Sequence, residues 1–280
     1  MELELWKATA DKNPIRLWDV TPGFDPATGQ DEPTVTPYLL EGPSRGCVIV
    51  FPGGGYWLKA GHEAEPVAKA MNAMGFSAFV LDYRVQPHRH PLPQLDAARA
   101  VRHVRHHAKE YGINPDRIAV LGFSAGGHLA ACTGVFWDLG SPGAADPVDR
   151  VSSRPDAMIL CYPVICMAGS NAHEGSAQAL LGAQRAAVIS ERDAVTPCLH
   201  VSARTAPTFL WHTADDETVP VGNSLEMFAA LKEHGVHAEL HVFPHGHHGL
   251  GLASDDRQVS QWAGLAGEFL RGLEFLANPL

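Results

Sequence analysis

The apolar residues of the chain gather in short, unbroken runs. They cover residues 47–51, 76–81, 117–121, 157–161, 207–211 and 238–243. An exposed strand would alternate apolar and polar residues, and these runs do not. Runs of this length without alternation are typical of strands that are buried on both faces, as in a parallel sheet.

Helical patterns separate these runs. The clearest covers residues 94–111, where apolar side chains recur every three or four positions. Further helices are predicted near residues 62–74, directly after Ser124, at 221–234 and at 255–276. Strands that alternate with helices predict the α/β class, with a mostly parallel central sheet and helices on both faces.

The chain of 280 residues is short enough for one hydrophobic core, so we expect a single domain over residues 1–280. The stretch up to about Gly46 is rich in turn-forming residues and predicts short edge strands and turns. The one long irregular connection covers residues 164–206. It is too short for a second domain, and we expect a small cap or lid there.

The strongest local motif is Gly122-x-Ser124-x-Gly126, which joins an apolar run to an alanine-rich helical segment. A serine between a strand and a helix must turn sharply, and glycines two residues away remove the side chains that would clash. The serine Oγ then stands exposed above the sheet. This context predicts a nucleophile, whereas the alternative is an ordinary glycine-rich turn.

A serine hydroxyl is a weak nucleophile and needs a base to take its proton. In this type of fold the acid and then the histidine follow the serine along the chain. Asp215 and Asp216 come just after one apolar run, and His247 and His248 come after the next. The residues themselves leave both choices open.

Four segments together resemble small α/β-hydrolase esterases, the bacterial acetyl-xylan-esterase-like and hormone-sensitive-lipase-like enzymes. These segments are residues 52–56, 122–128, 211–220 and 248–251. The resemblance extends from about Cys47 to Gly251. It implies an α/β-hydrolase fold, and it places the catalytic acid on Asp216 and the base on His248.

The resemblance also implies an oxyanion hole formed by the backbone N–H groups of Gly54, Gly55 and Ala125, which would stabilise the charged oxygen of the reacting ester. The chain departs from the pattern at Pro52, where the lipase-like branch has histidine. It departs again at Thr213, where glycine is usual. The first departure favours the acetyl-xylan-esterase-like branch.

Two aromatic residues follow the glycines. Tyr56 and Trp57 are candidates for lining the substrate pocket, and core packing is an equal alternative. A phosphate-binding loop is the other reading of the glycines, but no Lys-Ser/Thr end or dinucleotide spacing follows them.

The charge and composition of the chain limit the classes of molecule that it is expected to bind. The net charge of −10 disfavours nucleic acid and anionic membrane surfaces, and it favours a neutral or cationic substrate. The resemblance implies that this substrate is a small-molecule or oligosaccharide ester. We expect no cofactor and no metal. In particular, His103 and His107 lie off the apolar stripe of their helix, beside Arg99, Arg102 and Lys109, and are expected on a solvated face. The sequence is compatible with a homo-oligomer.

The cysteines form an odd set of five without a C-x-x-C pair, so we expect buried free thiols. The first residues lack a basic start and an apolar stretch, and no apolar run is long enough to cross a membrane. These features predict a cytoplasmic protein.

Three functions therefore compete. The first is a carboxylesterase for short acyl groups, with acetyl groups on xylan or xylo-oligosaccharides favoured by the resemblance. The second is a serine peptidase or amidase on the same fold. The third is a non-catalytic binding module. A lipase is disfavoured because the chain shows no long amphipathic lid.

Overall fold

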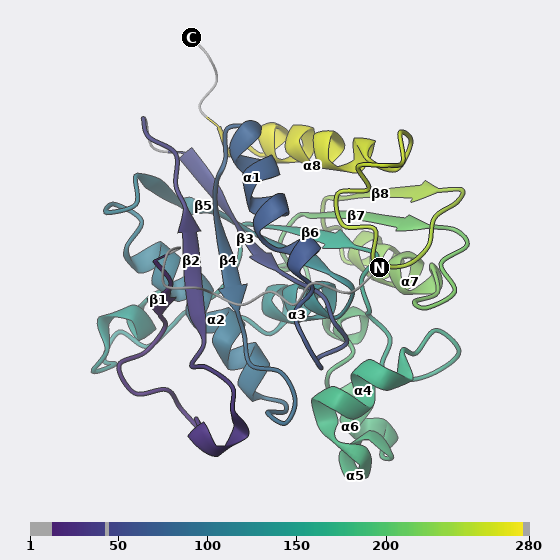
Figure 1. The fold of residues 1–280 in the computed structure, drawn as a ribbon, viewed down its shortest axis with the longest axis horizontal. Coiled ribbons are helices and arrows are strands. Elements are labelled where there is room, and N and C mark those ends of the chain that lie inside the picture. The colour runs from purple at the N-terminus through teal and green to yellow at the C-terminus, as the bar shows by residue number, and fades with distance from the viewer. Residues whose placement is uncertain (1–12, 43–44, 277–280) are drawn as a thin grey trace.

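An eight-stranded sheet runs through the centre of the molecule (Figure 1). The computed structural model describes residues 13–42 and 45–276, so the opening residues, in which no signal peptide is expected, lie outside the described residues. The strand order is β1-β2-β4-β3-β5-β6-β7-β8. The strands are β1 (Ile15–Arg16), β2 (Thr34–Tyr38), β3 (Arg45–Phe51), β4 (Ser77–Asp82), β5 (Ile113–Phe123), β6 (Ala157–Cys161), β7 (Thr208–Thr213) and β8 (Ala238–Phe243).

The sheet is parallel from β4 to β8, and only the edge pairs β1–β2 and β2–β4 are antiparallel. Each predicted apolar run forms one of the parallel strands. The α/β architecture expected from the pattern is confirmed, and so are the short edge strands near the start of the chain.

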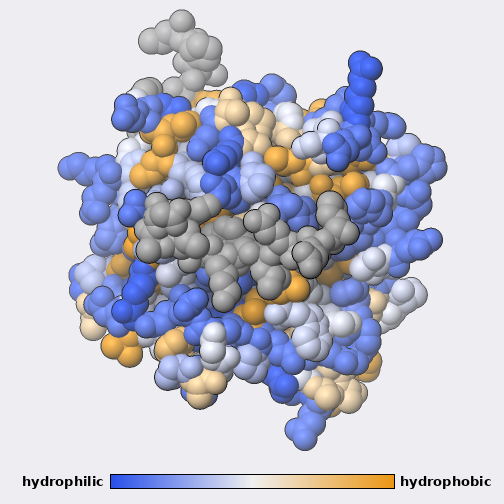
Figure 2. Space-filling view, viewed as in Figure 1, coloured by the Kyte–Doolittle hydropathy of each residue, from blue (hydrophilic) through white to orange (hydrophobic). Residues whose placement is uncertain are grey.

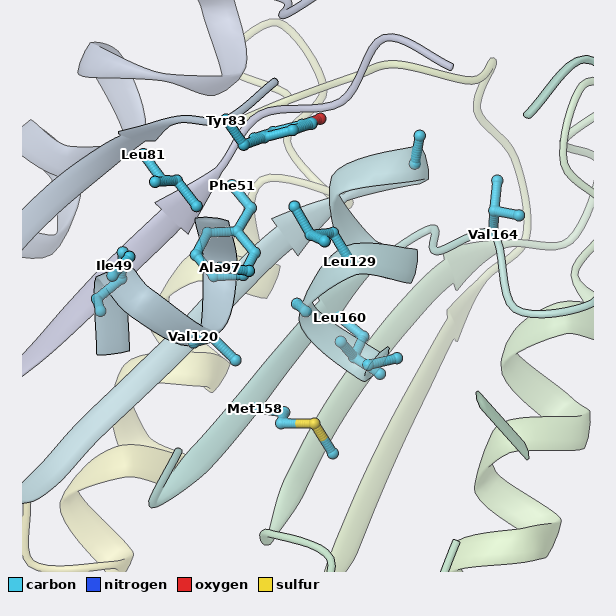
Figure 3. Packing of buried hydrophobic residues seen from close by; sticks show 14 of the residues in the cluster. Ile49, Phe51, Leu81, Tyr83, Ala97, Val120, Leu129, Met158, Leu160 and Val164 are labelled. Atoms are coloured by element: carbon cyan, nitrogen blue, oxygen red, sulfur yellow. The ribbon is translucent and has the colours of Figure 1, made fainter. Parts of the chain in front are cut away.

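Helices cover both faces of the sheet. Residues along β3 alternate between the two layers: Ile49 and Phe51 pack with α2 and α3, whereas Val48 and Val50 pack with α1 and α8. Figure 3 shows the first layer, where Phe51 and Leu129 lie close together above the sheet. The helices are α1 (Glu65–Ala73), α2 (Leu92–His106), α3 (Ser124–Val135), α7 (Gly222–Glu233) and α8 (Gln261–Gly272).

The connection of residues 164–206 is less irregular than its sequence suggests. It contains α4 (Glu174–Leu181), α5 (Ala183–Ala186), α6 (Ile189–Asp193) and the 3-10 turn η5 (Pro197–His200). These short helices stand apart from those that flank the sheet (Figure 1). The backbone N–H of His90 donates to Leu180 O at 2.8 Å, so the segment is held to the loop that follows β4.

The prediction of a solvated polar face on α2 is wrong for two residues. Arg99 is only 5% exposed and His103 only 7%. The turn η4 (Pro147–Arg150) covers Arg99, which pairs with Asp146 and Asp149 there. His103 instead lies against the rings of His107 and Tyr111. The apolar stripe alone could not reveal the burial of Arg99, because its cover comes from a segment about 50 residues away.

The molecular surface shown in Figure 2 is mostly hydrophilic, with apolar side chains scattered over it. Scattered apolar side chains are ordinary on protein surfaces. Within the described ranges, every helix is too short or too polar to cross a lipid bilayer.

One ion pair is completely buried beside the start of α2. Arg84 and Asp96 are at most 1% exposed, and Arg84 Nη2 lies 2.7 Å from Asp96 Oδ1. Burial raises the pKa of Asp96 to about 6, although the hydrogen bonds from Arg84 oppose this rise. At pH 8 the carboxyl is therefore ionised and paired.

We expect the Asp96→Asn substitution to lower the free energy of unfolding at pH 8 by about 3 kcal/mol, because it leaves the Arg84 charge buried without a counter-charge. Urea unfolding followed by tryptophan fluorescence measures the change. The matched control is Asp116→Asn, at an exposed position. A loss for Asp96→Asn no larger than for the control would contradict this account.

Candidate active site

Ser124 stands on a sharp turn between β5 and α3. Its φ of 52° lies in the left-handed region, which residues other than glycine rarely adopt. A Cβ atom on Gly122 would lie 2.1 Å from the carbonyl oxygen of Gly126, and one on Gly126 would lie 2.2 Å from that of Phe51. Both positions must therefore be glycine, and the strand–turn–helix geometry predicted for the motif is present.

Ser124, His248 and Asp216 form one chain of hydrogen bonds. The distance from His248 Nε2 to Ser124 Oγ is 2.7 Å, and the distance from His248 Nδ1 to Asp216 Oδ2 is also 2.7 Å. Asp216 follows β7 and His248 follows β8, so both lie at the carboxyl edge of the sheet with Ser124. This arrangement allows His248 to take a proton from Ser124 while Asp216 holds the ring.

The two neighbouring candidates have other partners. Asp215 is exposed and accepts hydrogen bonds from the backbone N–H of Gly246 and the ring of His245. His247 is exposed too, and its Nδ1 lies 2.7 Å from the carbonyl oxygen of His248. Among the described residues, neither the Asp215 nor the His247 side chain forms a hydrogen bond with Ser124.

The surroundings of Asp216 keep it charged. Burial opposes its ionisation, but hydrogen bonds from His212, His248 and Val219 outweigh this and hold the pKa of the carboxyl well below its usual range. The N–H groups of Thr218 and Val219 both donate to Oδ1 at 2.9 Å. Asp216 is therefore a fixed negative charge beside His248 at any pH near neutrality.

The glycine loop after β3 supplies free backbone donors. Gly54 and Gly55 adopt φ values of 131° and 64°, and within the described ranges their N–H groups have no hydrogen-bond acceptor. The N–H of Gly53 is used differently, because it donates to Glu63 Oε2 at 2.8 Å. Ala125 lies in the first turn of α3, where N–H groups lack partners inside the helix. These three donors can face a substrate oxygen.

The two aromatic candidates have different places. Tyr56 is only 1% exposed, and its hydroxyl lies 2.7 Å from His128 Nδ1. Its ring packs edge-on against Tyr83, so this side chain belongs to the core and the pocket-lining prediction does not hold for it. Trp57 is 54% exposed and remains a candidate for contact with substrate.

A family comparison fits this geometry. The model of the BD-FAE family matches residues 40–231, which include Ser124, Asp216 and the glycine loop. The chain belongs to the BD-FAE family.

Two curated relatives extend the comparison. Endo-1,4-beta-xylanase B of Butyrivibrio fibrisolvens is 38% identical to this BD-FAE chain over 231 residues, which are 80% of the chain and 35% of the relative. An acetylxylan esterase of Xylanibacter ruminicola is 30% identical over 244 residues, which are 84% of the chain and 47% of the relative. The chain thus spans less than half the length of these two relatives.

A solved structure matches nearly end to end. The acetyl ester-xyloside bifunctional hydrolase from Caldicellulosiruptor lactoaceticus is 51% identical, with a TM-score of 0.92. The match covers 95% of this chain and 98% of that one. The fold is therefore the α/β-hydrolase fold, and the domain is a carboxylic ester hydrolase domain.

A buried carboxylate joins the glycine loop of the BD-FAE domain (residues 53–55) to the histidine loop, the segment of residues 244–251 that follows β8 and carries His248. Glu63 is 2% exposed, and its Oε1 accepts the hydroxyl proton of Tyr162 at 2.6 Å. The Tyr162 hydroxyl in turn accepts the N–H of Gly251 at 2.8 Å. The Tyr162 ring also meets His248 edge-on, with centroids 5.0 Å apart. Glu63 and Tyr162 thus support both sides of the site, although no sequence motif pointed to them.

We expect the Tyr162→Phe substitution to lower the free energy of unfolding by about 1–3 kcal/mol, because Glu63 and the N–H of Gly251 each lose a buried partner. The kcat for p-nitrophenyl acetate should fall as well, because the histidine loop loses an anchor. Tyr111→Phe is the matched control, since its hydroxyl bonds to His103 on α2. Equal effects of the two variants on kcat would contradict a role in the site.

Metal-ligating side chains also come together outside this site. The rings of His103 and His107 lie next to each other at the end of α2, with centroids 4.6 Å apart and planes tilted by 39°. The described cysteines are free thiols; Cys47, Cys132, Cys161 and Cys166 are buried, and Cys198 is partly exposed. Within the described ranges, the group of side chains close enough to share an ion is Cys166, Cys198 and Glu226.

Proposed function

We propose that this chain is a serine esterase that hydrolyses short-chain carboxylic esters through an acyl-enzyme on Ser124, with acetyl groups on xylo-oligosaccharides as its substrates. The observation that carries the proposal is the unbroken hydrogen-bond chain from Ser124 through His248 to Asp216. The same arrangement of serine, histidine and aspartate recurs on unrelated folds in which a serine attacks an acyl carbon.

In the proposed first step, Ser124 Oγ attacks the ester carbonyl carbon while His248 Nε2 takes the hydroxyl proton. Asp216 stabilises the imidazolium that forms. The carbonyl oxygen gains negative charge, and the N–H groups of Gly54, Gly55 and Ala125 donate to it. One such donor typically lowers the barrier by about 3 kcal/mol.

The C–O bond between the acyl carbon and the alcohol then breaks, and His248 gives the proton that it took from Ser124 to the leaving alcohol oxygen. These steps complete the formation of the acyl-enzyme. Water then attacks the acyl-enzyme while His248 takes a proton from it. The acid leaves and Ser124 recovers its hydroxyl proton from the histidine.

The substrate assignment is supported by two observations. The relatives named above include an acetylxylan esterase and an acetyl ester-xyloside hydrolase. Ser124 is only 7% exposed, which suits a small acyl group better than a long chain. The sugar specificity follows from the similarity alone, because one fold serves many substrates.

The segment of residues 164–206 supports the idea of a cap. The N–H of Val164 donates to the backbone oxygen of Ser124 at 3.0 Å, so the segment begins beside the nucleophile. His173 lies further along it; burial lowers the pKa of its ring, and the charge of His248 lowers it further. We infer that this segment covers part of the pocket and limits the size of the substrate.

The test is a labelling and substrate experiment on the purified protein. A fluorophosphonate should modify Ser124 at about one label per chain, as mapped by mass spectrometry of peptides. Hydrolysis should be fastest for p-nitrophenyl acetate, slower for the butyrate and slowest for the octanoate, with acetate released from acetylated xylo-oligosaccharides. Faster cleavage of aminoacyl anilides would favour a peptidase, and absence of both label and hydrolysis would favour a binding module.

The proposal also fixes a pH dependence. His248 must be neutral to accept the proton, and the Asp216 carboxyl stays ionised because its pKa lies well below the usual range. We therefore expect kcat/KM for p-nitrophenyl acetate to reach a plateau at alkaline pH and to fall towards acid, with a limiting slope of about tenfold per pH unit, because a protonated histidine cannot act as the base. A rate that rises as the pH falls would contradict a histidine base.

A further inference from the structure

Two thiols and a carboxylate from three separate elements meet outside the active site. Cys166 follows β6, Cys198 lies in η5, and Glu226 lies on α7. The two Sγ atoms and one carboxylate oxygen all lie within 4.8 Å of one another. We propose that this cluster, Cys166–Cys198–Glu226, is a binding site for a zinc ion.

The spacing of the cluster suits zinc. In a tetrahedral site, Zn–S bonds of about 2.3 Å and Zn–O bonds of about 2.1 Å place neighbouring ligand atoms about 3.5–3.8 Å apart. Cys166 Sγ now lies 3.2 Å from Glu226 Oε2, where the thiol donates a hydrogen bond. An ion can therefore enter between these atoms with small movements of the side chains.

Neighbouring residues already orient two of the ligands. Asn223 is fully buried, and its Oδ1 accepts the N–H groups of both Ile165 and Cys166 at 2.8 Å. Asn171 Nδ2 donates to Glu226 Oε1 at 2.6 Å and leaves Oε2 for the ion. Partners of this kind hold metal ligands in place and raise the affinity of natural zinc sites.

The types of ligand atom in the cluster indicate which class of metal it would bind. Two sulfurs with one carboxylate favour zinc over magnesium and calcium, which prefer sites made of oxygen atoms alone. Glu226 is exposed and Cys198 is partly exposed, so the ion can enter from solvent and keep a water as its fourth ligand. Binding releases the two thiol protons to solvent, and the affinity should therefore rise with pH.

A bound ion would link parts of the structure that lie far apart in the chain. Cys166 and Cys198 lie near the two ends of the segment of residues 164–206, and Glu226 lies on a helix of the main domain. A bound ion would fasten both ends of this segment to α7. Because the N–H of Val164 donates to the backbone oxygen of Ser124, one of these two fastened ends lies beside the nucleophile.

Cobalt titration tests the site without relying on activity. The reduced and chelator-treated protein should develop thiolate-to-cobalt absorption that saturates at about one Co²⁺ per chain and disappears when Zn²⁺ is added. Cys166→Ser and Cys198→Ser should each abolish this absorption, and Glu226→Gln should weaken binding. The matched control is Glu233→Gln, at an exposed position on the same helix.

A second measurement covers the case in which a cysteine variant fails to fold. In the parent protein, Zn²⁺ should slow alkylation of Cys166 and Cys198 but leave the alkylation of Cys47, Cys132 and Cys161 unchanged, as mapped by mass spectrometry. Absence of cobalt absorption in the parent, or equal loss of affinity in Glu233→Gln, overturns the proposal. So does a Cys166–Cys198 disulfide that persists in reductant. None of these outcomes bears on the esterase mechanism.

Discussion

Replacing Ser124 with alanine is expected to lower kcat/KM for p-nitrophenyl acetate by about 10⁴-fold or more, because no other group replaces the attacking oxygen. The hydroxyl lies 2.7 Å from His248 Nε2, and the rest of the site would remain in place. Residual hydrolysis should come only from the oxyanion donors and from binding of the substrate. Initial rates of the parent and the variant at pH 8 measure the loss.

Ser141→Ala is the matched control for this variant, because Ser141 is exposed and lies between α3 and η4, outside the segment of residues 164–206. It should keep the parent's rate, and circular dichroism should show the same fold for all three proteins. If Ser124→Ala kept the parent's activity, the acyl-enzyme mechanism would fail and the nucleophile would have to be sought elsewhere.

Replacing Asp216 with asparagine is expected to lower kcat by about 10⁴-fold with little change in fold. The carboxylate accepts the Nδ1 proton of His248 and so keeps Nε2 free to receive the proton of Ser124. An asparagine amide can instead donate to Nδ1, which would leave the proton on Nε2 and block the base. Steady-state kinetics at pH 8 test this.

The adjacent Asp215 offers a closely matched control. It is also an aspartate bonded to a histidine, His245, but it is exposed and forms no hydrogen bond with His248 among the described residues. Asp215→Asn should change kcat less than about twofold, as exposed substitutions away from a site usually have small effects. A larger loss in Asp215→Asn than in Asp216→Asn would reverse the assignment.

The fold was largely predictable because its signal is local. Each apolar run is short and non-alternating, and each becomes one strand of the parallel part of the sheet. The burial of Arg99 was not predictable, since its side chain is covered by residues that lie far away in the chain. Sequence periodicity shows which face of a helix is apolar. It does not show which polar residues are later enclosed.

The candidate site likewise has one part that local sequence predicts and another that only the folded chain reveals. The geometry around Ser124 follows from glycines two residues on either side, so a short motif contains it. The support by Glu63 and Tyr162 joins residues 99 positions apart, and neither residue type is distinctive by itself. The Cys166–Cys198–Glu226 cluster was missed for the same reason. Only the folded chain brings its three elements together.

The left-handed backbone at Ser124 has an evolutionary consequence. A non-glycine residue at a φ of 52° raises the energy of the native state, whereas glycine adopts the same conformation freely. Selection for stability alone would therefore replace the serine, and drift in a lineage that no longer needs the reaction should lead to glycine there. The strain at this turn is thus the cost in native-state stability of placing a hydroxyl side chain there.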